Sequence, residues 1–484
     1  MRIGLDIDNV IADFDEGILK EFKIHDRNKR NKGIVNKNER YVSLLFDWSQ
    51  EEIRDFFTNH MERIAKTLNL RENVKYYMDK LLEEGHELYL ITNRVSPDYK
   101  NPKQVTEAWL EEKQINYTKL IFTETRDKSE ACNKYRIDIM FDDDIGNCIR
   151  LQNKNVRFCL MCTKLNYEHR GALPYVRDFK ELYEKVKYMN ERKKVILDTD
   201  MYNEVDDQFA LTYLLKSLDN IDLEAITIAP FSKSGYADDL PIEAGIERSY
   251  ETTLKILKMM YKEEYITKVY KGATNYFIDN PSDNEAVNKI IEIAHQNSLT
   301  TILGIGAITN IAMAIKKDPT IIPKIKVIWL GGNSFLSHQN REFNFIQDIE
   351  ATRLVFNSKV DLTIIPCRNV ASHLITTKYE LEHYIGNQEI GRYLIDTMTN
   401  CKKGYYPREI DAYGSSKTIW DLSAIAYIIN PDWFTVEHIS CPNILKDGSY
   451  EMTNNQHEVT FINDLSRNKI FNDYFKKMRN EYED

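Results

Sequence analysis

Two aspartates near the start of the chain stand two residues apart after a short apolar run. Asp6 and Asp8 follow residues 3–5, and an extended chain would place both carboxylates on the same side. One of two such carboxylates can attack phosphorus while its neighbour handles the proton of the leaving group. The pair alone could be a solvated acidic turn, so its interpretation depends on residues further along the chain.

Three later elements supply what phosphoryl transfer also requires. Thr92 ends the apolar run 88–91 and carries a hydroxyl that can hold a phosphate oxygen. Lys128 stands ahead of a helical pattern and could neutralise phosphate charge. Asp142, Asp143 and Asp144 end another apolar run and could hold Mg²⁺, which prefers carboxylate and water oxygens. A nucleophile, a metal and a positive clamp together are what attack on a phosphate dianion needs.

A second group of aspartates lies in the other half of the chain. Asp198 and Asp200 precede a short loop, and Asp206 and Asp207 follow it. Four carboxylates this close would repel one another unless a cation lay among them, and Ca²⁺ suits such an oxygen-rich loop. Helix capping would explain single residues of this group but not the whole set. Further polar candidates downstream are residues 304–312, Glu342, Asn344 and Asp421.

Parallel sheets would bring these side chains together, because the carboxyl ends of parallel strands meet at one edge. Short apolar runs alternate with helical patterns through both halves, which predicts two doubly wound, mostly parallel α/β sheets. The expected strands are residues 3–5, 88–91 and 137–141 in the first half, and 195–197, 225–229, 300–303, 327–330 and 362–365 in the second.

We expect two domains. Residues 179–194 resemble a closing amphipathic helix and a charged linker, which separates a domain of residues 1–188 from one of residues 189–484. The stretch from residue 14 to 67 is richly charged and helix-biased without a strand pattern. It predicts a small helical cap inserted at about residues 14–70.

Composition excludes several classes of protein. The 484 residues hold 65 Lys and Arg against 75 Asp and Glu, and the net charge of −10 argues against coating nucleic acid or a membrane. Hydrophobic residues at 42% suffice for sizeable cores. No apolar stretch reaches the roughly 20 residues of a membrane span, and no signal peptide is evident, so we expect a cytoplasmic protein. The seven cysteines are scattered, and Cys159 and Cys162 are interpreted as a buried strand end rather than a redox or zinc motif.

The first set of residues resembles the haloacid dehalogenase (HAD) superfamily of phosphatases. The stretches GLDIDNVIADF (4–14) and ITNR (91–94) are most similar to its 5'(3')-deoxyribonucleotidase-type branch, and the resemblance covers about residues 1–185. The roles that it implies are Asp6 as nucleophile, Asp8 as general acid/base, Thr92 and Lys128 as phosphate binders, and Asp6, Asp8, Asp142 and Asp143 as Mg²⁺ ligands.

The second set resembles the inosine-uridine nucleoside hydrolase family, over about residues 193–480. The family's aspartate cluster, its G-x-L-T-N-I-A and E-F-N-x-x-x-D-x-E-A segments and its late aspartate correspond to residues 198–207, 306–312, 342–351 and 421–427. The resemblance implies a homo-oligomer. It also implies Ca²⁺ ligands Asp200, Asp207, Asp421 and the carbonyl of Ile305, a base Asp200 for the attacking water, and ribose binders Asp206, Glu342 and Asn344.

The second set departs from the family pattern at two places. The loop between Asp200 and Asp206 is longer by two residues and lacks the family's glycine. Trp420 stands where family members often carry a histidine that protonates the leaving base. His373 or His338 could replace it, although a surface or core role is the alternative for both. Stacking on the base is the other interpretation, with candidates Trp420, Tyr202 and Tyr413.

Together the two halves predict a bifunctional hydrolase for nucleotide degradation or salvage. A nucleoside monophosphate would lose phosphate in the first domain, and the nucleoside would be cut to ribose and free base in the second. Its partners would be small-molecule nucleotides and nucleosides, with no nucleic acid and no membrane. The alternative is an active phosphatase joined to a sensor of a nucleoside or ADP-ribose-like ligand. A third hypothesis, action on nucleic-acid phosphate ends, is disfavoured by the acidic balance.

Overall fold

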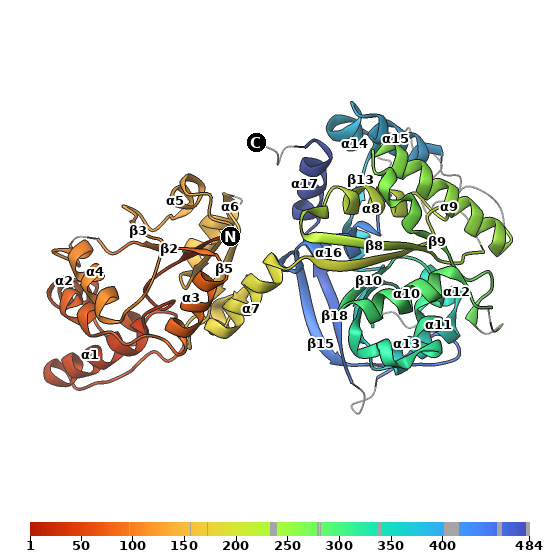
Figure 1. Ribbon diagram of the computed structural model, residues 1–484. Helices are drawn as coiled ribbons and strands as arrows, with labels where there is room; N and C mark the ends of the chain where they lie inside the picture. Colours follow the sequence, from red (N-terminus) through yellow and green to blue (C-terminus); the bar gives the residue numbers. More distant parts are fainter. Residues whose placement is uncertain are drawn as a thin grey trace. The chain divides into compact units, whose positions relative to one another are not determined.

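The chain divides into two compact units, residues Met1–Glu191 and Arg192–Asp484 (Figure 1). The computed structural model describes residues 1–95, 97–154, 156–171, 173–232, 240–277, 280, 282–335, 340–400, 416–452 and 457–480. Within these ranges, no helix combines the length and the apolar character that a membrane crossing requires.

The first unit is built on a sheet of six parallel strands in the order β3-β2-β1-β4-β5-β6. Leu5 pairs with Leu90 on one side and with Phe141 on the other, so the residues after these strands lie at the same edge. The strands are β1 (Arg2–Leu5), β2 (Glu87–Thr92), β3 (Lys119–Phe122), β4 (Ile139–Asp142), β5 (Phe158–Met161) and β6 (Tyr175–Val176). Cys159 lies in β5 and Cys162 follows it; both are buried, and neither forms a disulfide within the described part of the chain.

Two long helices form the insertion between β1 and the rest of the first sheet. Their core is aromatic: the ring of Phe22 stacks on Trp48 and tilts against Phe56, each at 4.4 Å between centroids. A capping box between Ser49 and Glu52 starts the second of these helices. The helices of the unit are α1 (Phe14–Lys29), α2 (Gln50–Thr67), α3 (Val74–Glu83), α4 (Pro102–Glu112), α5 (Ser129–Lys134), α6 (Ile145–Asn153) and α7 (Phe179–Asn190), with the 3₁₀ turns η1 (Val42–Leu44) and η2 (Tyr167–His169).

The second unit is built on a sheet of eight strands in the order β15-β18-β12-β11-β10-β7-β8-β9. All neighbours run parallel except β15, which is antiparallel to β18. The strands are β7 (Lys193–Thr199), β8 (Ile221–Ile228), β9 (Val269–Lys271), β10 (Thr300–Gly304), β11 (Ile325–Leu330), β12 (Asp361–Ile365), β15 (Phe434–Ser440) and β18 (Glu458–Leu465). Two short antiparallel pairs accompany them, β13 (Ile375–Thr376) with β14 (Lys417–Thr418) and β16 (Asn443–Ile444) with β17 (Tyr450–Glu451).

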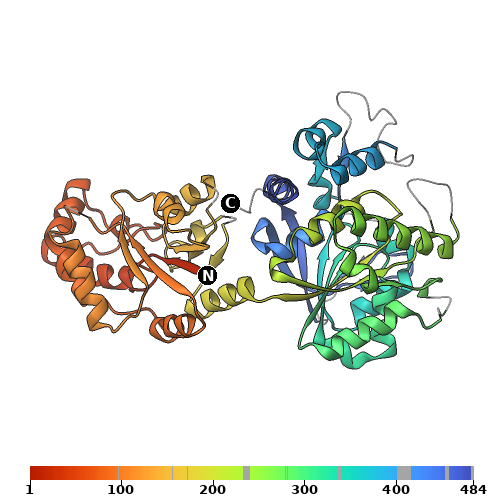
Figure 2. The ribbon, with the colours of Figure 1, turned by 45° about the horizontal axis from the view of Figure 1, so that its top comes forward.

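Helices cover both faces of this second sheet (Figure 2). Val195 and Leu197 belong to one apolar core and Ile196 to the other, as alternation along a buried strand requires. The helices are α8 (Asp206–Leu215), α9 (Ile242–Met259), α10 (Glu285–Gln296), α11 (Thr309–Lys317), α12 (Phe343–Gln347), α13 (Ile349–Asn357), α14 (Lys378–Ile385), α15 (Glu389–Asn400), α16 (Leu422–Ile429) and α17 (Arg467–Met478). The 3₁₀ turns are η3 (Leu218–Asn220), η4 (Glu263–Lys268), η6 (Pro319–Lys324), η7 (Ala371–His373) and η8 (Pro431–Trp433). The predicted class, mixed α/β with parallel sheets in both halves, is confirmed.

Candidate active sites

A buried lysine joins two carboxylates at the carboxyl edge of the first sheet. The Lys128 Nζ lies 2.7 Å from Asp6 Oδ1 and 2.7 Å from Asp142 Oδ2. Burial lowers the pKa of Lys128, but Asp142 and Asp6 outweigh this effect and raise it overall. The lysine is therefore held charged between the residue that follows β1 and the last residue of β4.

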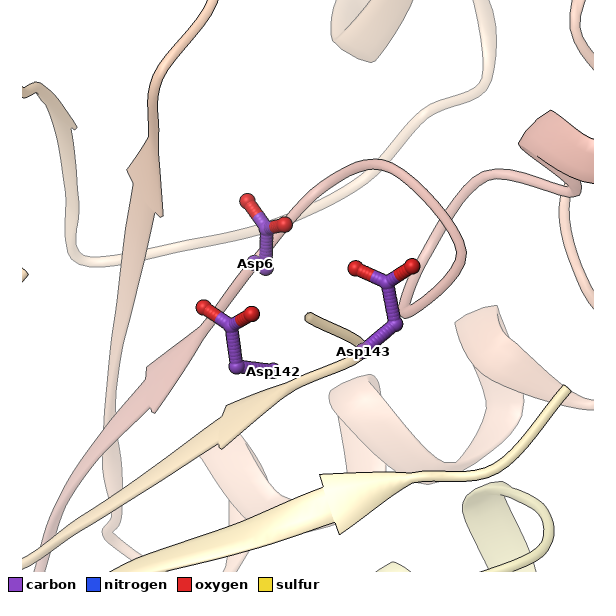
Figure 3. A group of neighbouring side chains, drawn as sticks. All are labelled: Asp6, Asp142 and Asp143. Carbon is purple, nitrogen blue, oxygen red and sulfur yellow. The ribbon is translucent and has the colours of Figure 1, made fainter. Parts of the chain in front are cut away.

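Asp143 completes a carboxylate group with Asp6 and Asp142 (Figure 3). One oxygen from each of the three lies within 4.8 Å of the others. Burial raises the pKa of Asp6 to about 7, and burial together with Asp6 and Asp142 raises that of Asp143 well above its usual value. Lys128 is a single positive charge and does not neutralise all three carboxylates, so the group remains negatively charged. Such a set of oxygens fits a divalent cation.

Asp8 lies outside this carboxylate group. Its two oxygens accept from Arg94, at 3.0 Å to Nε and 2.5 Å to the terminal nitrogen. Arg94 is almost fully buried, and this two-point pairing holds the Asp8 carboxylate in one orientation. Thr92 lies at the end of β2 as predicted and is buried, and its backbone carbonyl accepts from the amide of Thr123. Sequence reasoning missed the pairing of Arg94 with Asp8, although Arg94 lies two residues after the end of β2.

The inserted segment reaches the first site through Arg40 and Tyr41. Both line a cavity beside Asp143, and the Tyr41 hydroxyl donates to Asp144 at 3.1 Å. Asn9 lines the same cavity, and its Nδ2 donates to Asp143 at 2.9 Å. The inserted segment and Asp143 of the carboxylate group therefore line one cavity.

Three aspartates meet in the second unit at the starts of two buried helices. Asp206 and Asp207 begin α8, and Asp421 directly precedes α16. One oxygen of each lies within 4.8 Å of the others, and all three residues are buried. Thr199 donates from its hydroxyl to Asp207 at 2.5 Å. The aspartate pair predicted from the sequence and the late aspartate, over 200 positions away, are thus brought together.

Asp200 lies beside these three aspartates. Its Oδ2 is buried and has no hydrogen-bond partner among the described residues. Burial, then Asp207 and then Asp206 raise the pKa of Asp200 well above its usual value. The same causes act on Asp421, where burial is followed by Asp206, Asp207 and Asp200. Carboxylates that are buried, crowded and partly unpaired fit a site for a hard cation such as Ca²⁺.

Asp198 is held through one oxygen, while its buried Oδ2, like that of Asp200, has no hydrogen-bond partner among the described residues. Its Oδ1 accepts from the Thr227 hydroxyl at 2.6 Å and from Asn310 Nδ2 at 2.9 Å, and burial raises its pKa to about 6. Asn310 also donates to the carbonyl of Ile228 at 3.0 Å and accepts from the amide of Ala273 at 3.0 Å. The asparagine of the 306–312 segment therefore ties together the ends of β7, β8 and β9.

Glu342 and Asn344 are fixed at the start of α12. The Glu342 carboxylate accepts from the amides of Gly332, Asn344 and Phe345 at 2.9, 3.0 and 2.9 Å. Burial raises its pKa above the usual value. Asn344 Nδ2 donates to the carbonyls of Ile305 and Leu330, each at 3.1 Å. The carbonyl of Ile305 thus keeps one lone pair for another partner.

Two further groups at the second site escaped sequence reasoning. Lys417 pairs with Glu204 at 2.6 Å. Burial and then Glu204 raise the pKa of Asp206 well above its usual value, and Lys417 offsets part of this rise. The only sequence signal was the extra length of the loop that carries Glu204. The buried thiol of Cys367 lies against Glu342, and its pKa is raised by burial and by that carboxylate.

His373, one of the two histidine alternatives, does not lie with these carboxylates. His373 is about half exposed and pairs with Asp464, 3.3 Å away, while His338 and Tyr413 fall outside the described residues. Trp420 is partly buried and packs against the apolar core next to Asp421. Tyr202 is partly buried, and its amide donates to Ser249 at 3.0 Å.

Comparisons with known proteins identify the second unit. The family model described as inosine-uridine preferring nucleoside hydrolase matches residues 195–472. The inosine-uridine preferring nucleoside hydrolase of Crithidia fasciculata is 27% identical over 268 residues, covering 51% of this chain and 82% of that protein. The pyrimidine-specific ribonucleoside hydrolase RihB of Escherichia coli O1:K1 / APEC is 26% identical over 259 residues, covering 50% and 80%.

A solved structure also aligns with this chain. The purine-preferring ribonucleoside hydrolase from Gardnerella vaginalis has a TM-score of 0.49 at 22% identity, covering 60% of this chain and 98% of that one. Because the family model spans more than half of the 484 residues, the protein belongs, through its second unit, to the inosine-uridine preferring nucleoside hydrolase family.

Proposed function

We propose that the second unit hydrolyses the N-glycosidic bond of nucleosides to give ribose and free base. The observation that carries this proposal is the buried set of Asp200, Asp206, Asp207 and Asp421 in a chain of this family. The names of its relatives include inosine-uridine, pyrimidine and purine preferences. They do not select one base for this chain.

The donor set supports a Ca²⁺ site in the second unit. Asp200, Asp207, Asp421 and the carbonyl of Ile305 would hold the ion, with Asp206 beside them. When bound, Ca²⁺ supplies Lewis-acid activation of the attacking water and offsets the crowded negative charge. The unpaired Oδ2 of Asp200 would accept the proton of that water.

The remaining carboxylates would act on the sugar. Cleavage of a ribosyl–base bond passes through an oxocarbenium-like state, and fixed negative charge nearby stabilises it. Asp206, Glu342 and Asn344 would hold the ribose hydroxyls. The three hydrogen bonds from backbone amides hold the Glu342 carboxylate in place before substrate arrives, which favours the transition state. Trp420 would stack on the base.

We further propose that the first unit is a phosphomonoesterase for nucleoside monophosphates. The bridge from Lys128 to Asp6 and Asp142 supports this reaction. An Asp6 oxygen would attack phosphorus, and Asp8, oriented by Arg94, would give its proton to the departing ribose oxygen. Water, giving up a proton to Asp8, would then hydrolyse the aspartyl phosphate and restore both Asp6 and Asp8.

Thr92 and Lys128 would bind the phosphate oxygens in this reaction. The acidic group of Asp6, Asp142 and Asp143 would hold Mg²⁺. Asp8, the fourth ligand expected from the sequence, has both carboxylate oxygens paired with Arg94 instead. When bound, this ion supplies neutralisation of the transferred phosphoryl charge.

The charge of the second site favours one order of reactions. Its carboxylates outnumber its described cation, Lys417, which is itself paired with Glu204. A nucleotide phosphate would be repelled there, whereas a neutral nucleoside would not. Dephosphorylation in the first unit would therefore precede base release in the second, in a bifunctional nucleotide-degrading enzyme.

One panel experiment tests both proposals. The full chain is incubated with nucleoside monophosphates, Mg²⁺ and Ca²⁺, and phosphate, nucleoside and free base are measured. We expect Asp200→Ala to accumulate nucleoside and Asp6→Asn to stop phosphate release, while Asp219→Ala, an exposed aspartate, changes neither. Phosphate release without base from any nucleoside would instead favour the alternative, a phosphatase joined to a nucleoside or ADP-ribose-like sensor. Size-exclusion chromatography tests the expected homo-oligomer.

A further inference from the structure

A largely buried ion pair joins two segments of the second unit that lie 213 positions apart in the chain. The Nζ of Lys417 lies 2.6 Å from the Oε2 of Glu204, and the two side chains are only 9% and 24% exposed. Neither charge can leave the other without standing uncompensated where little water reaches it. The pair therefore resists separation of the two segments.

The segments that this pair joins are the ones that carry the grouped aspartates. Glu204 lies two residues before Asp206, which begins α8. Lys417 lies four residues before Asp421, which directly precedes α16. One oxygen of each of Asp206, Asp207 and Asp421 lies within 4.8 Å of the others. The ion pair and the carboxylate group therefore connect the same two segments at neighbouring points.

These two connections act in opposite directions when no cation is bound. The carboxylates repel one another and push the segments apart, whereas Glu204 and Lys417 attract and draw them together. The backbone of Lys417 is fixed independently, because β14 pairs with β13 and the amide of Ile419 donates to the carbonyl of Leu374 at 2.9 Å. The pair therefore holds the loop of Glu204 against a firm support.

The length of this loop is one of the departures from the family pattern. The loop is two residues longer than that pattern, and Glu204 lies within it. Met201 and Val205 of the loop are fully buried in the apolar core that also contains Ile419. This packing does not depend on the ion pair, so we expect variants that lack the pair to fold.

We propose that Glu204 and Lys417 are positioning residues that keep the Ca²⁺ site assembled while no ion is bound. The proposal rests on the Ca²⁺ site proposed for the second unit. A site that is already assembled binds its ion without first gathering carboxylates that repel one another, and the apparent Kd rises as the assembled fraction falls. The pair carries no net charge, so its contribution is to hold the aspartates in position rather than to attract the ion.

The test removes the pair without changing the net charge of the chain. Glu204→Gln combined with Lys417→Met deletes one negative and one positive charge. Calorimetry measures Ca²⁺ binding to the metal-stripped full chain in excess Mg²⁺, and the binding event that Asp421→Ala removes identifies the site of the second unit. We expect the double variant to bind Ca²⁺ about tenfold more weakly than the parent chain, as when about one chain in ten stays assembled.

The two single variants separate position from charge. Both lose the link, but Glu204→Gln also removes a charge that attracts Ca²⁺, and Lys417→Met removes one that repels it. The affinity of the double variant should therefore lie between those of the single variants and below that of the parent chain. If the pair acted through its charges alone, the double variant would bind Ca²⁺ as tightly as the parent chain, and that result would overturn the proposal.

Hydrogen exchange reports on the loop directly. The amide of Asn203, next to Glu204, donates to the carbonyl of Asp200 at 2.6 Å. Without metal, its protection should be lower in the double variant than in the parent chain, and bound Ca²⁺ should remove the difference. Equal protection in the two metal-free chains would contradict the proposed role of the pair.

A second ion pair of the same unit supplies the control. Lys289 and Glu292 on α10 also lie 2.6 Å apart, and Glu292→Gln combined with Lys289→Met should bind Ca²⁺ as the parent chain does. A loss in this control equal to that in the double variant would show a general effect of removing ion pairs and overturn the proposal. A parent chain that binds no Ca²⁺ in the second unit would overturn the proposed metal site as well, whereas the other outcomes leave that site standing.

Discussion

At the scale of single residues, both sites are organised by buried charges whose partners are few. Lys128 stands between two carboxylates in the first unit, and Asp200 in the second has an oxygen with no partner in the described part of the chain. A buried charge is costly when its partner is removed, because the partner then remains buried without compensation. The residues proposed to act in catalysis are therefore also expected to be sensitive points for stability.

Replacing Lys128 with methionine tests this point in the first unit. Lys128→Met leaves Asp6 and Asp142 facing each other without a cation, so we expect the free energy of unfolding to fall by about 3–5 kcal/mol in metal-free buffer. Added Mg²⁺ should recover part of this loss, but not phosphate release. Urea denaturation and a phosphate assay measure both effects. Lys134→Met, on the exposed side of α5, is the control, and equal stability of the two variants would contradict the account.

At the scale of elements, turns and helix starts position the functional side chains. Gly332 has φ +77°, and its amide donates to Glu342. A Cβ there would lie 2.3 Å from the hydroxyl of Tyr450, whose ring packs against Phe335 and Phe345. The turn after β11 therefore requires glycine for both conformation and space.

A pair of glycine substitutions separates these two requirements. Gly85 has φ +84° and open space around it, so Gly85→Ala carries only the backbone strain. Gly332→Ala adds the clash with Tyr450, and we expect it to lower the free energy of unfolding by about 1–2 kcal/mol more than Gly85→Ala does. It should also slow base release, because the bond to Glu342 is displaced. Equal unfolding free energies for the two variants, measured in urea, would refute the close packing.

The capping box of α2 makes a pH prediction for the inserted helices. The hydrogen bond from Arg30, then the bonds from Ser49, lower the pKa of Glu52 to about 2. A carboxyl whose pKa is lower in the folded chain stabilises it above the unfolded value, and this contribution is lost as the pH falls from about 4.5 to about 2. The protection factors of the amides in the first turn of α2, which correct exchange rates for their intrinsic pH dependence, should therefore fall over this range. Glu52→Gln should exchange faster at neutral pH and show a smaller pH dependence, and parallel profiles would contradict this assignment.

The strands that carry the sites could be predicted from sequence, whereas the partners of their side chains could not. Runs such as residues 195–197 and 300–303 are apolar and β-branched, because both faces of the sheet are covered. The three-residue β9 is too short to show a pattern, and β15 exposes most of its side chains, so neither was predicted. Arg94 with Asp8 and Lys417 with Glu204 are 86 and 213 positions apart. Such pairs depend on tertiary packing, which leaves no local signal.

At the scale of the whole molecule, two compact units each carry a complete group of candidate catalytic side chains. The group of Asp6, Asp142 and Asp143 belongs to the first unit, and that of Asp206, Asp207 and Asp421 to the second. Neither group takes a residue from the other unit. The chemistry of each is therefore expected to be independent when its own substrate is supplied.

Single-site variants in the two units test this independence. Asp6→Asn should lower phosphate release by at least about 10³-fold, as loss of a covalent nucleophile does, while base release from added nucleoside stays within about twofold. Asp200→Ala should show the opposite pattern. Separate assays with nucleoside monophosphate and with nucleoside measure the two reactions. A large loss of both reactions in either variant would argue for one joint site.

The most direct measurement is base release from nucleosides by the full chain, treated with chelator and then with Ca²⁺. The buried carboxylates of the second unit predict that chelation abolishes release and that Ca²⁺ restores it in the parent chain and in Asp219→Ala. In Asp421→Ala, which removes one of the grouped carboxylates, Ca²⁺ should restore little or nothing. Base release that is insensitive to chelation, or absent from every nucleoside tested with Ca²⁺ present, would contradict the central claim.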